Sequence, residues 1–140
     1  MPVCTFFGHR DCSENVKPSL YSTIENMLVS NNVHTFYVGN HGNFDRLVLS
    51  VLKELKNKYQ NIEYYVVLAY LPPESHGLEN YETIFPEGIE NVPKRFAIDF
   101  RNRWMIKRSD YVVTCINRNF GGAAKARDFA VKQGKKIIEI

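Results

Sequence analysis

Short runs of apolar, β-prone residues alternate with helical patterns along this chain, and the alternation limits the possible folds more than any other feature. The expected strands cover 3–7, 33–38, 64–71, 111–116 and 136–140, and the expected helices cover 18–30, 43–55, 94–107 and 121–133. Strands that are apolar throughout belong in a parallel sheet with helices on both faces. The sequence therefore predicts a doubly wound, Rossmann-like α/β fold with a mainly parallel sheet of about five strands.

The size and composition of the chain are those of one globular domain, which we place at 1–140. Of its 140 residues, 44% are hydrophobic and 24% are charged. No stretch approaches the roughly 18 consecutive apolar residues of a membrane helix. The N-terminal MPVCTFFGHRD lacks the basic leader and cleavage site of an export signal. We therefore expect a cytoplasmic protein with no membrane partner.

Cysteine usage and charge narrow the set of partners. Cys4, Cys12 and Cys115 are odd in number and show no CxxC spacing, so they predict neither a disulfide framework nor a zinc site. The net charge of +3 is mild, and its Lys and Arg residues are scattered. A nucleic-acid interface usually needs a stronger basic stripe. We expect a small anionic ligand, no nucleic acid, no metal and no cofactor.

The segment 72–93 differs from the rest of the chain because it has no clear period and carries four prolines. Structureless loops of this length are uncommon in compact domains, and those that occur are usually functional or disordered. We expect a long loop, or a lid over a ligand.

The first glycine-bearing loop, Gly8-His9-Arg10, follows the first expected strand. Ligands of open parallel sheets bind at the carboxyl ends of the strands. Glycine permits a tight turn there, and the Arg10 guanidinium can donate a forked pair of hydrogen bonds to a phosphate. The alternative is a turn glycine followed by ordinary solvated polar residues.

The second loop, 39–43, separates the second strand from its helix and contains Gly39, Asn40, Gly42 and Asn43. Two glycines let the backbone approach a ligand, and the following helix offers free N–H groups at its N-terminus. Asn43 could instead be only the helix N-cap. His41 is not a credible metal ligand, because no other His or Cys lies at ligand spacing from it.

The third loop, 117–125, is the strongest local signal. A strand leads into Gly121 and Gly122, which open a helix of small residues, and this arrangement presents backbone N–H groups to a phosphate. We add Arg118, Ala123 and Lys125 to the expected ligand-binding residues. The alternative is a plain turn whose small residues allow close packing of helix and sheet. The Walker A spacing is absent, which argues against ATP hydrolysis of the P-loop kind.

The helix at 94–107 carries Arg95, Arg101 and Arg103, which we place on or near one polar side. Such a charged face is usually solvated, although the start of this helix could face the crevice beside the long loop. Its tryptophan, Trp104, lies at a helical spacing consistent with packing in the core or at an interface.

Taken together, these segments resemble the SLOG superfamily of Rossmann-like proteins, which includes the LOG phosphoribohydrolases and the DprA fold. The resemblance rests on FFGHRD, FYVGNHGNFDRLV, NVPKRFAIDFRNRWMIKRSDYVV and GGAAKA, and it spans nearly the whole chain. LOG enzymes carry a PGGxGTxxE motif whose glutamate assists cleavage of the N-glycosidic bond. Gly121 and Gly122 match its glycine pair, Asp128 stands where the glutamate would be, and Arg101 matches an arginine of the preceding helix.

Departures from that motif shift the expected function from hydrolysis towards binding. Phe120 replaces its proline, Ala124 its later glycine and Lys125 its threonine. An aspartate is one methylene shorter than a glutamate, and small displacements in an active site cost much of the rate. The resemblance implies a sensor or sequestering protein for a nucleotide-derived, phosphate-bearing molecule. The alternative is a nucleoside 5′-monophosphate phosphoribohydrolase with Arg101 and Asp128 as its catalytic residues.

SLOG-type domains often assemble as dimers or larger oligomers, so the resemblance also implies a homo-oligomer. The helix from Phe96 to Met105 is the expected seam. Nucleic-acid binding of the DprA kind is the least favoured reading, given the mild charge.

Overall fold

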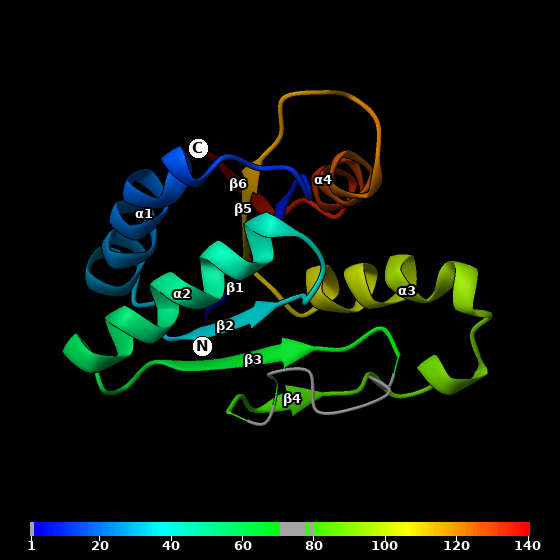
Figure 1. The fold of residues 1–140 in the computed structure, drawn as a ribbon, viewed down its shortest axis with the longest axis horizontal. Helices are drawn as coiled ribbons and strands as arrows, with labels where there is room; N and C mark the ends of the chain where they lie inside the picture. The colour runs from blue at the N-terminus through cyan, green and yellow to red at the C-terminus, as the bar shows by residue number, and fades with distance from the viewer. Residues whose placement is uncertain (1, 71–77, 79) are drawn as a thin grey trace.

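The computed structural model describes residues 2–70, 78 and 80–140, and it shows a parallel sheet between two layers of helices. The sheet has six strands in the order β4-β3-β2-β1-β5-β6, and every neighbouring pair is parallel. Figure 1 shows this arrangement. The strands are β1 (Val3–Gly8), β2 (Thr35–Val38), β3 (Glu63–Val67), β4 (Thr83–Ile84), β5 (Tyr111–Cys115) and β6 (Lys136–Glu139). The doubly wound, Rossmann-like α/β fold predicted from the sequence is confirmed.

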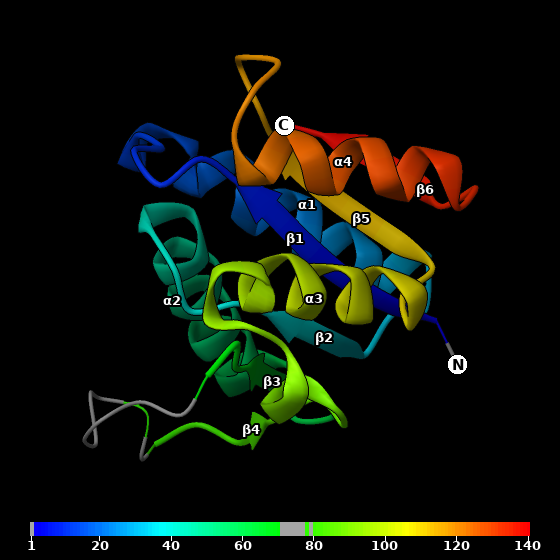
Figure 2. The ribbon, with the colours of Figure 1, turned by 90° about the vertical axis from the view of Figure 1, so that its right-hand side faces the viewer.

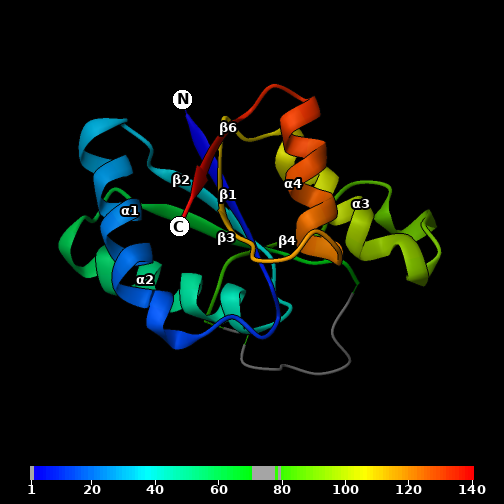
Figure 3. The ribbon, with the colours of Figure 1, turned by 90° about the horizontal axis from the view of Figure 1, so that it is seen from above.

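Four α-helices connect the strands, and each pair of them covers one face of the sheet. Helices α1 and α2 lie on one side, and α3 and α4 lie on the other (Figures 2 and 3). Short 3₁₀ turns precede α1 and α3. The helical elements are η1 (Glu14–Val16), α1 (Lys17–Ser30), α2 (Asn43–Lys58), η2 (Ile89–Asn91), α3 (Lys94–Lys107) and α4 (Gly122–Lys132).

The core consists mainly of two apolar clusters, one on each face of the sheet. The larger lies under α1 and α2 and includes Phe6, Phe36 and Phe44, all fully buried. The smaller lies under α3 and α4 and includes Phe7 and Met105. Helix α2 shows why helical spacing is informative, because its apolar residues are all buried: Phe44, Leu47, Val48, Leu49, Val51, Leu52 and Leu55.

The segment predicted as a structureless loop at 72–93 is partly regular. It contains β4, which pairs with β3, and η2, and this raises the strand count from about five to six. A strand of two residues is too short to leave a period in the sequence, which is why it was missed. Part of the predicted lid, at 72–77 and 79, and residue 71 before it lie outside the described residues. No helix of the described chain is long and apolar enough to cross a membrane.

Other boundaries shift by a few residues. β2 begins at Thr35 and β3 ends at Val67, so both are shorter than predicted. The N-cap of α2 is Gly42, and Asn43 is the first residue of the helix. Met105 lies on the buried face of α3 and cannot form part of an exposed seam between copies, whereas Phe96 of the same helix is 51% exposed. The predicted oligomer stays a prediction.

Candidate ligand-binding site

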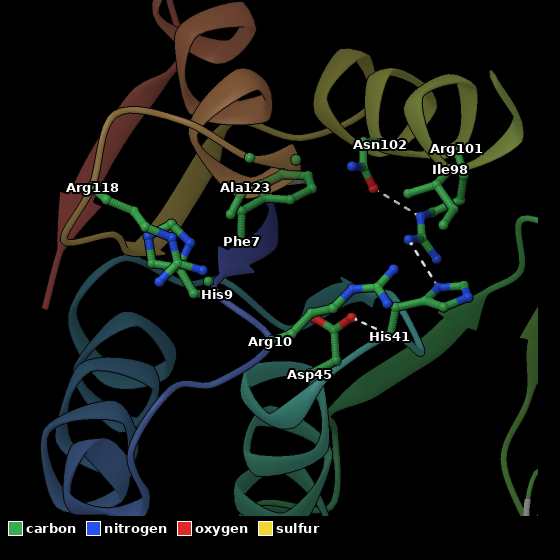
Figure 4. A pocket seen from close by; sticks show the side chains of 13 residues that line it. Phe7, His9, Arg10, His41, Asp45, Ile98, Arg101, Asn102, Arg118 and Ala123 are labelled. Carbon is green, nitrogen blue, oxygen red and sulfur yellow. Dashed lines mark hydrogen bonds between the residues drawn. The ribbon is translucent and has the colours of Figure 1, made fainter. Parts of the chain in front are cut away.

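A pocket of about 310 Å³ lies at the carboxyl end of the sheet, where β1 is flanked by β2 and β5. This is the place where the strand order of an open parallel sheet reverses and where such folds hold their ligands. Figure 4 shows side chains from the β1 and β2 loops facing those of α3 across this pocket. It is lined by Phe7, Gly8, His9, Arg10, His41, Asp45, Ile98, Arg101, Asn102, Arg118, Gly121, Gly122 and Ala123.

The loop after β1 forms one wall and is tied to its neighbours by hydrogen bonds. The carbonyl oxygen of Arg10 accepts from the backbone N–H of Asn43 at 2.9 Å. The Nε2 atom of buried His9 lies 3.2 Å from the backbone nitrogen of Asn117, whose N–H it accepts. This bond assigns the proton of a neutral His9 ring to Nδ1. The first and third glycine loops are therefore held together across the sheet.

The loop after β2 approaches the β1 loop so closely that it requires glycine. Gly42 has a φ of 93°, and a Cβ there would lie 2.7 Å from the Cα of Arg10. The side-chain amide of Asn43 donates to the carbonyl of Cys12, and its oxygen accepts from Arg46. Asn43 thus holds the loops together, and its polar atoms are not free for a ligand.

Arg101 reaches from α3 towards the β2 loop and is the most unusual residue of the pocket, because its side chain is charged and only 3% exposed. Its guanidinium donates to four neutral acceptors: Asn102 Oδ1 at 2.8 Å, the Val67 carbonyl at 3.0 Å, His41 Nδ1 at 3.3 Å and Asn40 Oδ1 at 3.4 Å. Within the ranges 2–70, 78 and 80–140, Arg101 forms no ion pair with a carboxylate. The acceptors that hold its positive charge in place are all neutral, and Asp45 is a nearby carboxyl group that acts on this charge without bonding to it.

Because Gly39 has no side chain, Asp45 and Arg101 can both lie close to it on the same wall of the pocket. A Cβ at Gly39 would lie 2.8 Å from Asp45 Oδ2 and 3.0 Å from Arg101 Nη1. Asp45 is the third residue of α2, and its Oδ2 accepts from the backbone N–H of His41 at 2.9 Å. This contact has the form of a helix-capping bond that reaches back over the N-terminus.

The loop after β5 supplies the opposite wall and the N-terminus of α4. Gly121 is the N-cap with a φ of 97°, and no described side chain accepts from the helix there. The first N–H groups of an α-helix lack acceptors in the helix itself, so they are free for an anion. Arg118 forms an ion pair of 3.2 Å with Asp11, and its guanidinium lies 5.4 Å from the ring centre of the exposed Phe120.

The comparisons with known proteins bear on the fold of this chain. No family model matches it, and no curated protein matches its sequence. Among solved structures, it is similar to DNA processing protein A (DprA) from Streptococcus pneumoniae, with a TM-score of 0.73 and 16% identity. The match covers 99% of this chain and 50% of the DprA chain, so the chain spans about half the length of that protein.

The chain has a DprA-like Rossmann fold. At this identity the similarity describes the fold alone, and it agrees with the Rossmann-like α/β architecture predicted from the sequence.

In this DprA-like domain, most of the predicted ligand-binding residues converge. Those that line the pocket are Gly8, His9, Arg10, Arg101, Arg118, Gly121, Gly122 and Ala123. Four others, Gly39, Asn40, Gly42 and Asn43, support the wall behind it. Arg101 does not lie on a polar side of its helix, as we had placed it, but on the buried face.

Two predicted residues stand apart from the pocket. Lys125 is exposed and pairs with Asp99 at 3.4 Å. Asp128, the predicted partner of Arg101 in catalysis, has a side chain that is 62% exposed and pairs with Arg127 at 3.2 Å. Neither Lys125 nor Asp128 lines the pocket. The structure therefore does not bring the predicted catalytic pair together.

Five lining residues were not predicted: Phe7, His41, Asp45, Ile98 and Asn102. His41 had been considered only as a metal ligand, and no cluster of metal-binding side chains occurs among the described residues. A signal for Asp45 was present, because an acid at the third position of a helix that follows GxxG often folds back over the helix start.

The electrostatics of the pocket favour an anion. Burial and the Arg101 and Arg10 charges lower the pKa of His41 to about 4, so this ring is neutral near pH 7. Burial also lowers the pKa of His9, with Arg118 as a second cause. Burial raises the pKa of Asp45 to about 6, against the opposing effect of Arg101. The charged lining residues are thus three arginines, Arg10, Arg101 and Arg118, and one carboxyl group, that of Asp45, while Arg118 also pairs with Asp11 outside the lining.

The raised pKa of Asp45 predicts how stability changes with pH. Its folded-state value of about 6 lies above the ordinary 3.8, so the native state binds more protons between these values. The stability that this carboxyl contributes is fully present below pH 4 and is lost as the pH rises through 6. Relative to the wild type, Asp45→Asn should gain about 2 kcal/mol between pH 4 and pH 7.

Urea unfolding of both proteins at several pH values measures this difference. Asn can still accept the His41 N–H bond, so the substitution removes the titration and keeps the contact. Asp128→Asn, at an exposed carboxylate, is the matched control and should follow the wild type at every pH. A constant difference between Asp45→Asn and the wild type would show that Asp45 titrates normally.

Proposed function

We propose that this chain binds a nucleotide-derived molecule through its phosphate, as a sensor or a sequestering protein. The observation that carries the proposal is the buried Arg101 guanidinium, which has only neutral hydrogen-bond acceptors and lines the same pocket as the uncapped N-terminus of α4. A charge held in this way is costly for a protein that never neutralises it. A phosphate oxygen would supply both an anionic hydrogen-bond partner for the guanidinium and acceptors for free N–H groups.

The remaining lining residues suit the rest of such a ligand. The pocket volume is at the lower end of the range for small-molecule sites, which fits a phosphosugar with its base directed outwards. Phe7 and Ile98 give one side of the pocket an apolar surface, and Phe120 exposes 70% of its surface on the adjoining loop. Aromatic rings in such positions stack on bases without reading their sequence.

The alternative, a phosphoribohydrolase, receives less support from the geometry. The reaction requires a carboxylate at the glycosidic bond, and Asp128 is outside the pocket and paired with Arg127. Asp45 is the one carboxyl group among the described lining residues, and it is engaged by the His41 backbone. The arrangement can hold a phosphate without providing a free carboxylate for cleavage.

One incubation followed by chromatography with mass detection tests both functions. The purified chain is mixed with AMP, other nucleoside monophosphates, ADP-ribose and cyclic ADP-ribose, separated from unbound ligand, and denatured. We expect one compound to return intact from the protein fraction. Release of free base with ribose 5-phosphate would instead establish hydrolysis, and Asp45→Asn and Asp128→Asn would then show which carboxylate takes part. If nothing is retained or cleaved, the proposed function is wrong.

A further inference from the structure

Two of the three cysteines lie side by side next to the pocket. Cys12 follows β1 in the loop that carries His9 and Arg10, and Cys115 is the last residue of β5. Their Sγ atoms are 3.4 Å apart, although 103 positions separate them in the chain. Both residues are partly exposed, whereas Cys4 is completely buried in the core. The pair is therefore within reach of a small reagent, and the third cysteine is not.

Both cysteines lie outside the pocket lining, in segments that are hydrogen-bonded to its walls. The N–H of Cys12 donates to the His9 carbonyl at 3.1 Å, and the Cys12 carbonyl accepts from the side chain of Asn43. On the other side, Asn117, two residues after Cys115, donates its N–H to His9 Nε2. A covalent link between the two sulfur atoms would join the first and third glycine loops directly.

We propose that Cys12 and Cys115 form a reversible disulfide, a redox modification site that connects the two phosphate-facing loops of the pocket. The distance between the sulfur atoms must shorten from 3.4 Å to the length of a disulfide bond, about 2.05 Å, which is a small displacement. Cys12 lies in a loop outside helix and strand, so its backbone can make this adjustment. The proposal concerns the thiols themselves and holds whether or not the ligand is a nucleotide.

The oxidant of this reaction is a low-molecular-weight disulfide such as oxidised glutathione. The Cys115 thiolate attacks one sulfur of the reagent, forming a mixed disulfide and releasing the other half as a thiolate. Cys12 then loses its proton and attacks the Cys115 sulfur, which releases the second half. The two cysteines together lose two electrons and two protons, and the reagent gains them as two thiols.

The surroundings of the pair assign these roles. Burial, the hydrogen bond to Cys115 and the negative charge of Asp11 raise the pKa of Cys12 to about 12. Cys12 therefore keeps its proton in the reduced pair and attacks in the second step, after Cys115 has formed the mixed disulfide. Because a thiolate is the attacking species, oxidation should also be faster at alkaline pH.

The test is oxidation of the full chain with excess oxidised glutathione, followed by alkylation, mass measurement and peptide mapping. We expect the loss of two of the three titratable thiols, no retained glutathione, and one linked peptide pair containing Cys12 and Cys115. Excess dithiothreitol should restore all three thiols. Cys4→Ser is the matched control and should form the same link.

Cys12→Ser and Cys115→Ser should each prevent the internal link, and Cys12→Ser should stop at the mixed disulfide on Cys115. Circular dichroism checks that each variant is folded. If one variant does not fold, peptide mapping of the oxidised wild type still tests the proposal. The proposal is wrong if the oxidised wild type keeps three thiols, or if it carries only glutathione adducts. Since the readout counts thiols, a failure of nucleotide binding would leave this result unaffected.

Discussion

Replacing Gly8 with alanine is expected to destabilise the domain by about 3 kcal/mol, which is at the upper end of the effects of overpacking. A Cβ at this position would lie 2.3 Å from Cγ and 2.8 Å from Cβ of Phe44. Phe44 is completely buried at the start of α2, so its ring has no space to enter. Rotation about its side-chain bonds also leaves its own Cβ where it is. The clash can be relieved only by moving α2 away from the end of β1.

Equilibrium unfolding in urea measures this effect, and Gly122→Ala is the matched control. Gly122 lines the same pocket and is the first residue of α4, but a Cβ there would meet nothing within 4 Å. We expect this control to be unchanged or more stable by up to about 1 kcal/mol, because alanine favours the helix and restricts the unfolded chain. A Gly8→Ala protein as stable as the wild type would mean that α2 is not fixed against β1.

A double substitution separates the clash from other causes. Phe44→Ala alone should cost about 3–5 kcal/mol, because it leaves a cavity in the core. The same substitution makes room for a methyl group at Gly8, so the double variant should be clearly more stable than the sum of the two losses predicts. Additive losses would indicate that the cost of Gly8→Ala does not arise from contact with Phe44.

The fold could be predicted from the sequence because strands and helices each show a characteristic pattern of apolar residues. The strands of the sheet centre are short apolar runs, and the buried face of α2 repeats at helical spacing from Phe44 to Leu55. These signals arise from burial and are local, so they survive without any knowledge of neighbours. β4 was missed because its two residues, Thr83 and Ile84, are fixed by pairing with β3 and not by any pattern of their own.

The site was only partly predictable, and Arg101 shows why. Its place in a helix with several arginines indicated a solvated face. Ala97 and Met105, each four positions away, share its side of the helix and are buried, so a signal was present. The charge of Arg101 favours solvent, whereas this spacing favours the buried face. The direction of a charged side chain depends on the acceptors it meets, and these come from β3, the loop after β2 and α3 itself.

Contacts between distant segments could not be predicted from one sequence. The Cys12–Cys115 pair depends on the parallel pairing of β1 with β5, in which Gly8 lies opposite Cys115. Spacing arguments apply to neighbours in the chain, and these two residues follow different strands. The separation of Asp128 from Arg101 has the same origin, since the two lie on adjacent helices whose relative rotation is set by packing.

Substituting Arg101 by lysine should weaken binding of the compound that the protein retains by about 10- to 100-fold, which corresponds to the loss of a charged hydrogen bond. The guanidinium has five N–H donors in a fixed fork, and the Val67, Asn102, His41 and Asn40 acceptors hold that fork in one orientation. Lysine keeps the positive charge but cannot make the same set of bonds. The effect therefore tests positioning and not charge alone.

Arg103→Lys is the matched control, because Arg103 lies on the same helix with a half-exposed side chain that pairs with Asp99. Isothermal titration of the three proteins with the retained compound gives the affinities, and thermal unfolding without ligand shows whether each variant is folded. We expect Arg103→Lys to bind like the wild type. If Arg101→Lys does so too, the phosphate is held by Arg10, Arg118 and the α4 N-terminus alone, and the buried guanidinium serves to fix the β2 loop against α3. If affinity falls only for Arg101→Lys, the fixed orientation of the buried guanidinium, and not its charge alone, is what selects the anion.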